Sequence, residues 1–351
     1  MTASPIVRHP RLLGIGLLLA LALGWHPGAG AGEVRASKTG PATVAPGQEV
    51  WPGGWQALNK TLAGNGEYQF NARFHDFNGN PVAINFDMPA AWSHEAASEF
   101  GVFQSELDAI VERCRATTGC DQAALDREMT RYLQARGVRV RHLSDRHMRL
   151  SVDVPAVVAR NRERVTPVAG ALRDLAARHG HGHEWTLEAA MALVQGGMAY
   201  GHPAGVENGR RIIGFYPPPR ALAEGYGDCD TKAALLAAIL GNLTDAAIIG
   251  VKVPDHYLLG IAAEPAPGQA WITHEGRSYV LVEAAGPAVR RPGDVSDQTT
   301  YALNNQAILR VDPIYCGSIR PPPPDRFMPL VACPPGPADN PQSPRTGRQW
   351  V

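Results

Sequence analysis

One cysteine in the middle of the chain has the surroundings expected of a nucleophile. Cys229 follows Gly-Tyr-Gly-Asp at 225–228 and begins an apolar helical pattern that predicts a helix over 228–240. Its thiol would lie at the helix N-terminus, where unpaired backbone N–H groups and the helix dipole stabilise a thiolate. The two glycines would allow a sharp turn and the close approach of a substrate backbone. The alternative for a lone helical cysteine is a small core residue.

A histidine and a glutamate follow at the ends of two strand-like segments. His256 directly precedes the apolar segment 257–262, and Glu283 ends the segment 279–283. If these two strands are antiparallel neighbours, both side chains can face the N-terminus of the cysteine helix. Cysteine, histidine and carboxylate would then form a set of nucleophile, base and orienting group. Taken singly, His256 is also consistent with a surface turn and Glu283 with a solvated strand end.

Four segments of the chain resemble one family, the bacterial transglutaminase-like proteins, which are similar in fold to papain-like cysteine proteases. Residues 225–233 resemble the family's nucleophile motif, 255–260 its histidine strand and 279–284 its acidic strand. Val194-Gln195, followed by Tyr200, resembles the segment upstream of the nucleophile. The resemblance covers residues 156–290 well and the N-terminal region only loosely.

The resemblance implies an α+β fold. Its core would be a papain-like transglutaminase core, in which the nucleophile helix packs on an antiparallel sheet, and an N-terminal α+β extension would precede it. Cys229 would attack the carbonyl of a peptide or a glutamine side chain to give a thioester, His256 would shuttle the proton, and Glu283 would hold the imidazole tautomer. Water as the acceptor gives proteolysis or deamidation, and an amine gives cross-linking. We favour hydrolysis of a protein or peptide substrate, and this chemistry needs no cofactor.

The sequence departs from the family pattern at two places. Glu283 stands where the family more often has Asp, and no Trp directly precedes Cys229. We therefore expect the Cys229 N–H and the Gln195 side chain to serve an oxyanion, with Gly227 and Asp228 on the substrate side. A structural amide beneath the loop is an equal alternative for Gln195.

Charged residues surround the predicted nucleophile. Asp228 and Asp230 could contact a cation or substrate, but helix capping and a favourable first-turn charge are the simpler interpretation. Both carboxylates would raise the thiol pKa and so oppose the helix terminus. Lys232 would compensate for them or lie exposed.

A histidine-rich stretch raises the question of a metal site. His179, His181, His183 and Glu184 would share a face only on a strand, and the intervening glycines favour a loop. We therefore predict no physiological metal site.

The N-terminus has the pattern of an export signal. A basic start precedes an uncharged apolar run over 12–25, and Ala29-Gly30-Ala31 has the small-x-small cleavage pattern. A membrane span needs about 20 residues, so we predict a signal peptide over 1–31, cleaved near Ala31, and a periplasmic or secreted protein. An uncleaved anchor is the alternative.

An oxidising compartment gives the five cysteines a meaning. Cys114 and Cys120 form one natural local pair, and Cys316 and Cys333 form a second, although other pairings remain open. Cys229 is then left unpaired, as a thiol in use would be.

Composition bounds the function classes and the layout. Lys+Arg and Asp+Glu are 33 each, and 44% of residues are hydrophobic, which excludes wholesale disorder and argues against a duplex nucleic-acid binder. We predict a linker over 32–60, an N-terminal α+β region over 61–155 with two hairpins, a catalytic domain over 156–318, and a Pro-rich tail over 319–351 without sheet or helix. No nucleic acid or membrane partner is expected beyond the export signal.

Two other functions fit the same sequence. The chain could be a catalytically silent transglutaminase-like fold that serves as a protein-binding module, with the N-terminal region and the tail as recognition elements. Alternatively, Cys229 could form a disulfide with a partner chain and serve a structural role.

Overall fold

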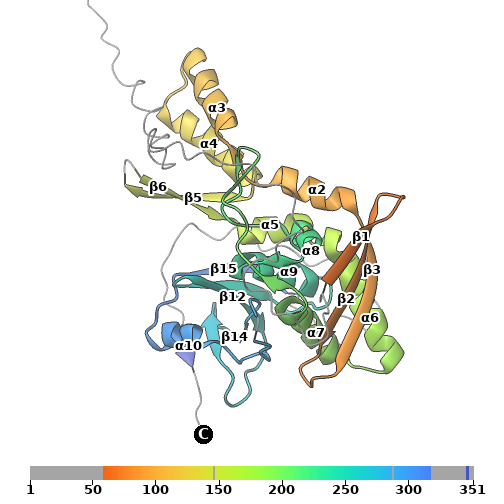
Figure 1. The fold of residues 1–351 in the computed structure, drawn as a ribbon. Helices are drawn as coiled ribbons and strands as arrows, with labels where there is room; N and C mark the ends of the chain where they lie inside the picture. The colour runs from red at the N-terminus through yellow and green to blue at the C-terminus, as the bar shows by residue number, and fades with distance from the viewer. Residues whose placement is uncertain (1–57, 145–146, 287, 318–344, 348–351) are drawn as a thin grey trace, which may run out of the picture. The chain divides into compact units, whose positions relative to one another are not determined.

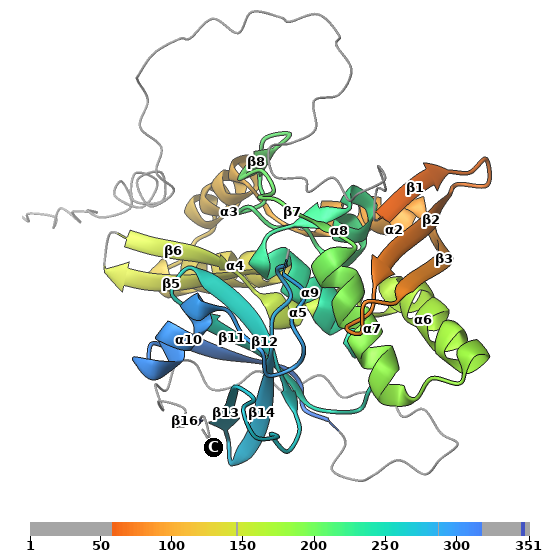
Figure 2. The same ribbon diagram turned by 60° about the horizontal axis from the view of Figure 1, so that its bottom comes forward.

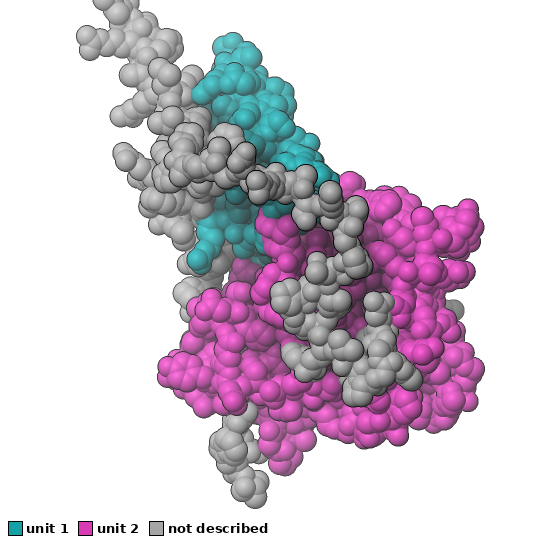
Figure 3. Space-filling view, in the orientation of Figure 1, with its two compact units in different colours: residues 1–44, 101–153, 206–213 teal, residues 45–100, 154–205, 214–351 magenta. Residues whose placement is uncertain are grey.

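The computed structural model describes residues 58–144, 147–286, 288–317 and 345–347. These divide into two compact units, shown in Figure 3. The first unit comprises the described residues of 101–153 together with 206–213, and the second comprises those of 58–100, 154–205 and 214 onward. The predicted signal peptide, nearly all of the predicted linker and most of the tail lie outside the described residues. Within the described ranges, no helix is long and apolar enough to cross a membrane.

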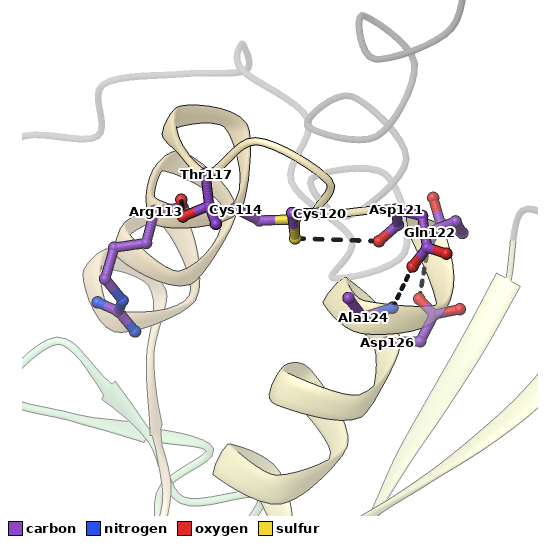
Figure 4. Close-up of a disulfide and its surroundings, with 8 residues drawn as sticks. All are labelled: Arg113, Cys114, Thr117, Cys120, Asp121, Gln122, Ala124 and Asp126. Carbon is purple, nitrogen blue, oxygen red and sulfur yellow. Dashed lines mark hydrogen bonds between the residues drawn. A yellow bond between two sulfur atoms is a disulfide. The ribbon is translucent and has the colours of Figure 1, made fainter.

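The first unit is built on a pair of helices. The helices α3 (Gln104–Ala116) and α4 (Gln122–Ala135) pack side by side, and a disulfide between Cys114 and Cys120 closes the turn between them (Figures 1 and 4). Asp121 caps α4 by accepting a hydrogen bond from the Ala124 N–H at 2.8 Å. The predicted Cys114–Cys120 pairing is confirmed. Cys316 is also disulfide-bonded, and its predicted partner, Cys333, lies outside the described residues.

Short antiparallel strands complete the first unit. The strands β5 (Val138–Ser144) and β6 (His147–Val152) form the second predicted hairpin. The strands β4 (Val102–Phe103), β9 (Arg210–Arg211) and β8 (Val206–Glu207) form a small sheet in that order. The pairing of β4 with β9 brings residues 206–213 into this unit across a long sequence separation.

The second unit begins with a three-stranded antiparallel sheet. It consists of β1 (Leu58–Leu62), β2 (Glu67–His75) and β3 (Pro81–Pro89), and it contains the first predicted hairpin. Alternate residues of β2 and β3 are buried, and this apolar face packs on α6 (Thr166–His179) and α7 (His183–Gly196). A one-faced sheet needs such a covering layer. Residues 58–100 therefore belong with the elements after 154, so the structure divides the chain differently from the predicted boundary near 155.

A largely apolar, buried helix forms the centre of the second unit. All residues of the helix α9 (Cys229–Leu240) except Asp230 are buried. It contacts α5 (Val154–Asn161), α6, α7 and the short helix α8 (Pro218–Glu224), as Figures 1 and 2 show. Such a pattern is typical of a helix enclosed by other elements. The helix α8 also packs against α2 (Ala90–Glu99) and the 3-10 turn η1 (Glu163–Val165), which come earlier in the chain.

The C-terminal half of the second unit is a six-stranded sheet. Its order is β15 (Arg310–Tyr315), β11 (Ile248–Val253), β12 (His256–Ala262), β14 (Arg277–Val282), β13 (Trp271–His274) and β16 (Arg345–Gly347), and all its pairs are antiparallel. The helix α9 packs against β12. Ala302 and Leu303 of α10 (Asp297–Asn304) belong to an apolar cluster with residues of β11, β13 and β14. The fold is thus α+β with antiparallel sheets.

Several local predictions are wrong. The helix α7 begins at His183, so only residues 180–182 separate it from α6, where Gly180 in the left-handed conformation ends the preceding helix. The Pro-rich segment 217–219 provides the N-cap and the first two residues of α8, because proline is well tolerated in a first helical turn. The tail contributes the strand β16, although we predicted no sheet there.

Candidate active site

The turn before α9 positions the predicted nucleophile. The strands β7 (Ala199–Tyr200) and β10 (Tyr226–Gly227) form a two-residue parallel pair directly ahead of it. Asp228 then caps the helix, accepting a hydrogen bond from the Thr231 N–H at 3.1 Å. A Cβ at Gly227 would lie 2.4 Å from Cγ2 of Thr231, so this position excludes a side chain. Cys229 is consequently the first residue of α9, as predicted.

The sheet brings the predicted base and acid together. The strands β12 and β14 are antiparallel neighbours, with Leu259 opposite Val282. The Nε2 atom of His256 lies 2.6 Å from Oε2 of Glu283, and both side chains are buried. The pairing that the sequence could only propose is thus a short contact within the structure.

Two further donors hold the carboxylate of Glu283. Its Oε1 accepts hydrogen bonds from the Ser296 N–H at 3.1 Å and from the Thr299 hydroxyl at 2.8 Å. Burial would raise the pKa of Glu283, but the hydrogen bond and charge of His256, together with these donors, lower it to about 2. The carboxylate is therefore ionised at neutral pH, so Nε2 of His256 carries the shared hydrogen. This leaves Nδ1 as the nitrogen that can exchange a proton with another group.

The thiol lies at the same end of β12. The Tyr257 backbone N–H donates a hydrogen bond to the Cys229 sulfur, which places the sulfur beside the peptide bond that joins His256 and Tyr257. Tyr257 is fully buried, and its hydroxyl donates to Oδ2 of Asp312 at 3.0 Å. The first residue of β12 is His256, so the same strand carries the predicted base and, one residue later, the N–H that binds the thiol. Tyr257 was not predicted as a site residue, because in the sequence it is only one member of an apolar segment.

The thiol is protonated in this arrangement. The pKa of Cys229 is raised to about 12. Burial is the largest cause, followed by the charge of Asp230, the hydrogen bond between Asp230 and the thiol, and the charge of Asp228. The sulfur donates to Oδ1 of Asp230 at 3.1 Å. The expectation that the helix terminus stabilises a thiolate is therefore wrong for this state, because desolvation and two carboxylates outweigh the helix dipole.

Basic side chains lie near the acidic residues beside Cys229. Nζ of Lys252 on β11 lies 3.8 Å from Oδ1 of Asp230, and Nδ1 of His202 lies 3.9 Å from Oδ2 of Asp228. Burial and the charge of Asp230 raise the pKa of Asp228, although its bond from Thr231 opposes this. Capping is the role that the contacts of Asp228 support.

The amide of Gln195 has a structural set of contacts. Nε2 donates to the backbone carbonyls of Glu283 at 2.7 Å and Arg290 at 3.0 Å, and Oε1 accepts from the Arg290 N–H at 2.7 Å. Both amide hydrogens are thus engaged, so the predicted oxyanion role of Gln195 does not fit this geometry. The structural alternative does fit, and the Cys229 N–H is left as the predicted donor because the first N–H groups of a helix lack intrahelical partners.

Two residues near Cys229, one charged and one aromatic, lie in surroundings that the sequence did not predict. Lys232, which we expected to be exposed if it did not compensate the aspartates, is completely buried. Tyr200 is 41% exposed, and its pKa is raised by burial and then by the charges of Cys229, Asp228 and Asp230. Tyr200 therefore belongs to the surroundings of the thiol, although the sequence had marked it only as part of an upstream resemblance.

The histidine-rich stretch is divided between two helices. His179 ends α6, His183 begins α7, and the ring of His181 stacks on Trp185 with centroids 4.1 Å apart. Across the part of the chain that the structure describes, no group of three or more His, Cys, Asp or Glu residues could hold a metal ion.

Comparisons with known proteins offer no relative for this arrangement. No family model matches the chain, and neither a curated protein nor a solved structure resembles it to a significant degree.

Proposed function

We propose that this protein is an exported acyl-transfer enzyme with a cysteine nucleophile, of the transglutaminase-like type, acting on a peptide bond or a glutamine side-chain amide. The observation that carries the proposal is the buried 2.6 Å contact between His256 and Glu283 at the end of β12 where the Cys229 sulfur lies. An ionised carboxylate fixing one imidazole nitrogen beside a thiol is the arrangement that general-base activation of a nucleophile requires. The finer fold assignment, a papain-like transglutaminase core, is part of the same proposal and is supported by α9 packing on β12.

The protonated thiol favours one form of this chemistry. A pKa of about 12 disfavours a preformed thiolate–imidazolium pair. Instead, His256 removes the thiol proton as sulfur attacks the substrate carbonyl, and Glu283 stabilises the imidazolium that forms. The same imidazolium then protonates the departing amine or ammonia, which leaves a thioester on Cys229. The first N–H groups of α9 offer donors for the developing oxyanion.

The acceptor decides the product. Attack by water, with His256 again taking the proton, gives a carboxylic acid and regenerates the thiol; this is proteolysis or deamidation. Attack by a primary amine gives a new amide and hence a cross-link. We favour hydrolysis, since water is available to any exported enzyme, whereas cross-linking also needs a bound amine.

The direct test is capture of the thioester. The protein is incubated with p-nitrophenyl acetate, quenched in acid, and analysed by intact mass before and after treatment with hydroxylamine. We expect one acetyl group that hydroxylamine releases, its absence in Cys229→Ala, and slower acylation in His256→Gln. A glutamine-containing peptide, supplied with and without a fluorescent amine, then separates ammonia release from amine incorporation.

Matched controls separate catalysis from folding. Cys114→Ser with Cys120→Ser removes sulfur from the first unit and should leave acylation at Cys229 unchanged, because that disulfide belongs to the other unit. Equal acetylation of wild type and Cys229→Ala would reject the proposal. A folded wild type that forms no thioester with ester or peptide would favour the catalytically silent binding module instead.

A further inference from the structure

Lys232 has an unusual environment for a lysine. It lies one turn after Cys229 on α9, and none of its surface is exposed. Lysine is almost never fully buried without a charged partner, because desolvating the ammonium group is costly. No ion pair within the described ranges involves Lys232, and burial is the cause that lowers its pKa to about 7. A purely apolar helix core would not require this residue.

The contacts of Lys232 lie at the end of the neighbouring helix. Its Nζ donates to the backbone carbonyl of Gln195 at 3.2 Å and to that of Met198 at 3.1 Å. The last carbonyls of a helix lack intrahelical partners, and the negative end of the helix dipole favours a cation there. The ammonium group therefore ties the C-terminus of α7 to the nucleophile helix.

The same end of α7 also holds the segment that carries Glu283. The Gln195 side chain donates to the Glu283 carbonyl at 2.7 Å and exchanges two hydrogen bonds with the backbone of Arg290. Gly286, with φ +65°, lies so close that a Cβ there would be 2.2 Å from the Gln195 carbonyl oxygen. One peptide of α7 thus contacts both Lys232 and the chain after β14.

We propose that Lys232 and Gln195 are positioning residues, which together fix the nucleophile helix and the Glu283 segment against the C-terminus of α7. Lys232 is not a catalytic residue, since its Nζ bonds two backbone carbonyls. Its position determines how the start of α9 meets the His256–Glu283 pair. The inference rests on the proposed function for its meaning, but the geometry it predicts can be measured without substrate.

The test compares Lys232→Met with a control on the same helix. Methionine keeps the length and apolar volume of the side chain but cannot donate to the two carbonyls. Leu240→Ala, at the other end of α9 and equally buried, lowers stability without touching the network. Both proteins are studied in conditions where far-UV circular dichroism shows them folded.

The first readout is the downfield proton resonance of the short His256–Glu283 hydrogen bond. The second is the rate of Cys229 alkylation by iodoacetamide. We expect Lys232→Met to shift or lose the resonance and to change the alkylation rate on the order of tenfold, since small displacements of reacting groups have large effects on rate. Leu240→Ala should leave both readouts near wild type.

Gln195→Met provides a second approach from the other helix, useful if Lys232→Met does not fold. It removes the bonds to the Glu283 carbonyl and to Arg290 but not the α7 carbonyl that Lys232 contacts. We expect the same shift of the resonance and, in the double variant, an effect smaller than the sum of the two. A folded Lys232→Met or Gln195→Met with an unchanged resonance and unchanged alkylation would overturn the inference, as would an equal effect of Leu240→Ala.

Failure of the proposed function is distinguishable from failure of this inference. If wild type forms no thioester, the enzyme assignment fails while the resonance still reports on positioning. If wild type forms the thioester and both positioning variants keep the resonance, only the positioning role fails.

Discussion

Replacing Asp230 with Asn should make Cys229 more reactive. Asp230 affects the thiol in two ways that both favour the protonated form: its charge lies beside the sulfur, and its Oδ1 accepts the thiol hydrogen at 3.1 Å. Asparagine removes the charge and retains the shape of the side chain. The pKa of Cys229 should therefore fall in Asp230→Asn.

The structure limits the size of this effect. The rise of the thiol pKa from 9.0 to about 12 corresponds to roughly 4 kcal/mol at 1.36 kcal/mol per pKa unit, and burial is its largest cause. Two unit charges about 4 Å apart interact by about 1 kcal/mol in water and about 4 kcal/mol near a protein surface. Asp230 is partly exposed and also faces Lys252, so we assign it about 1–2 kcal/mol. That is about one pKa unit, or about tenfold in thiolate at fixed pH.

The assay is alkylation by iodoacetamide across pH 7–9, followed by intact mass and peptide mapping to Cys229. We expect Asp230→Asn to react about tenfold faster than wild type at each pH. Lys252→Met should react more slowly, because the carboxylate of Asp230 loses its cation 3.8 Å away. The double variant should react as fast as Asp230→Asn.

Asp230 is expected to act only through the protonation of the Cys229 thiol. Equal or slower alkylation in a folded Asp230→Asn would refute this expectation. An effect of Lys252→Met that persists in the double variant would show that Lys252 acts on the thiol by another route.

Three further outcomes follow from the structure. Glu283, with its pKa lowered from 4.5 to about 2, should contribute roughly 3 kcal/mol to the free energy of unfolding above pH 4.5, and this contribution is lost as pH falls toward 2. Urea unfolding at pH 7 and pH 3 should show much of this loss in wild type and a much smaller one in Glu283→Gln. Gly227→Ala would place its methyl group 2.4 Å from the Thr231 side chain, so it should displace the start of α9. Thioester formation should be slower than in wild type even at temperatures where the variant remains folded by circular dichroism. The Cys114–Cys120 disulfide closes only a short loop, so replacing both cysteines with serine should lower the free energy of unfolding by about 2 kcal/mol, measured by thermal unfolding. Thioester formation should not change.

Local patterns in the sequence indicated that Cys229 and His256 stand at the starts of a helix and a strand. Asp228 before an apolar helix fixes Cys229 at the first position, since a capping side chain and helical periodicity act over a few residues. The apolar segments 257–262 and 279–283 were recognisable as strands from their composition, although their antiparallel pairing was decided by the fold. The Cys114–Cys120 pair depended only on a short turn.

Tertiary structure alone decided how those residues are supported. Ser296 and Thr299, at the start of a helix that the sequence did not predict, donate hydrogen bonds to Glu283. The side-chain amide of Gln195 is hydrogen-bonded to backbone groups 88 and 95 residues further along the chain. These contacts join segments separated by many residues, so no local pattern signals them.

The burial of ionisable side chains could not be predicted from the sequence. Cys229 and Lys232 both carry pKa shifts for which burial is the largest cause, and burial depends on every element packed around α9. The sequence could place a thiol at a helix terminus, which favours ionisation, but only the packed structure determined that its surroundings keep it protonated. The choice of Cys229 as the candidate nucleophile was thus a local inference, whereas the protonation state of its thiol is a property of the whole second unit.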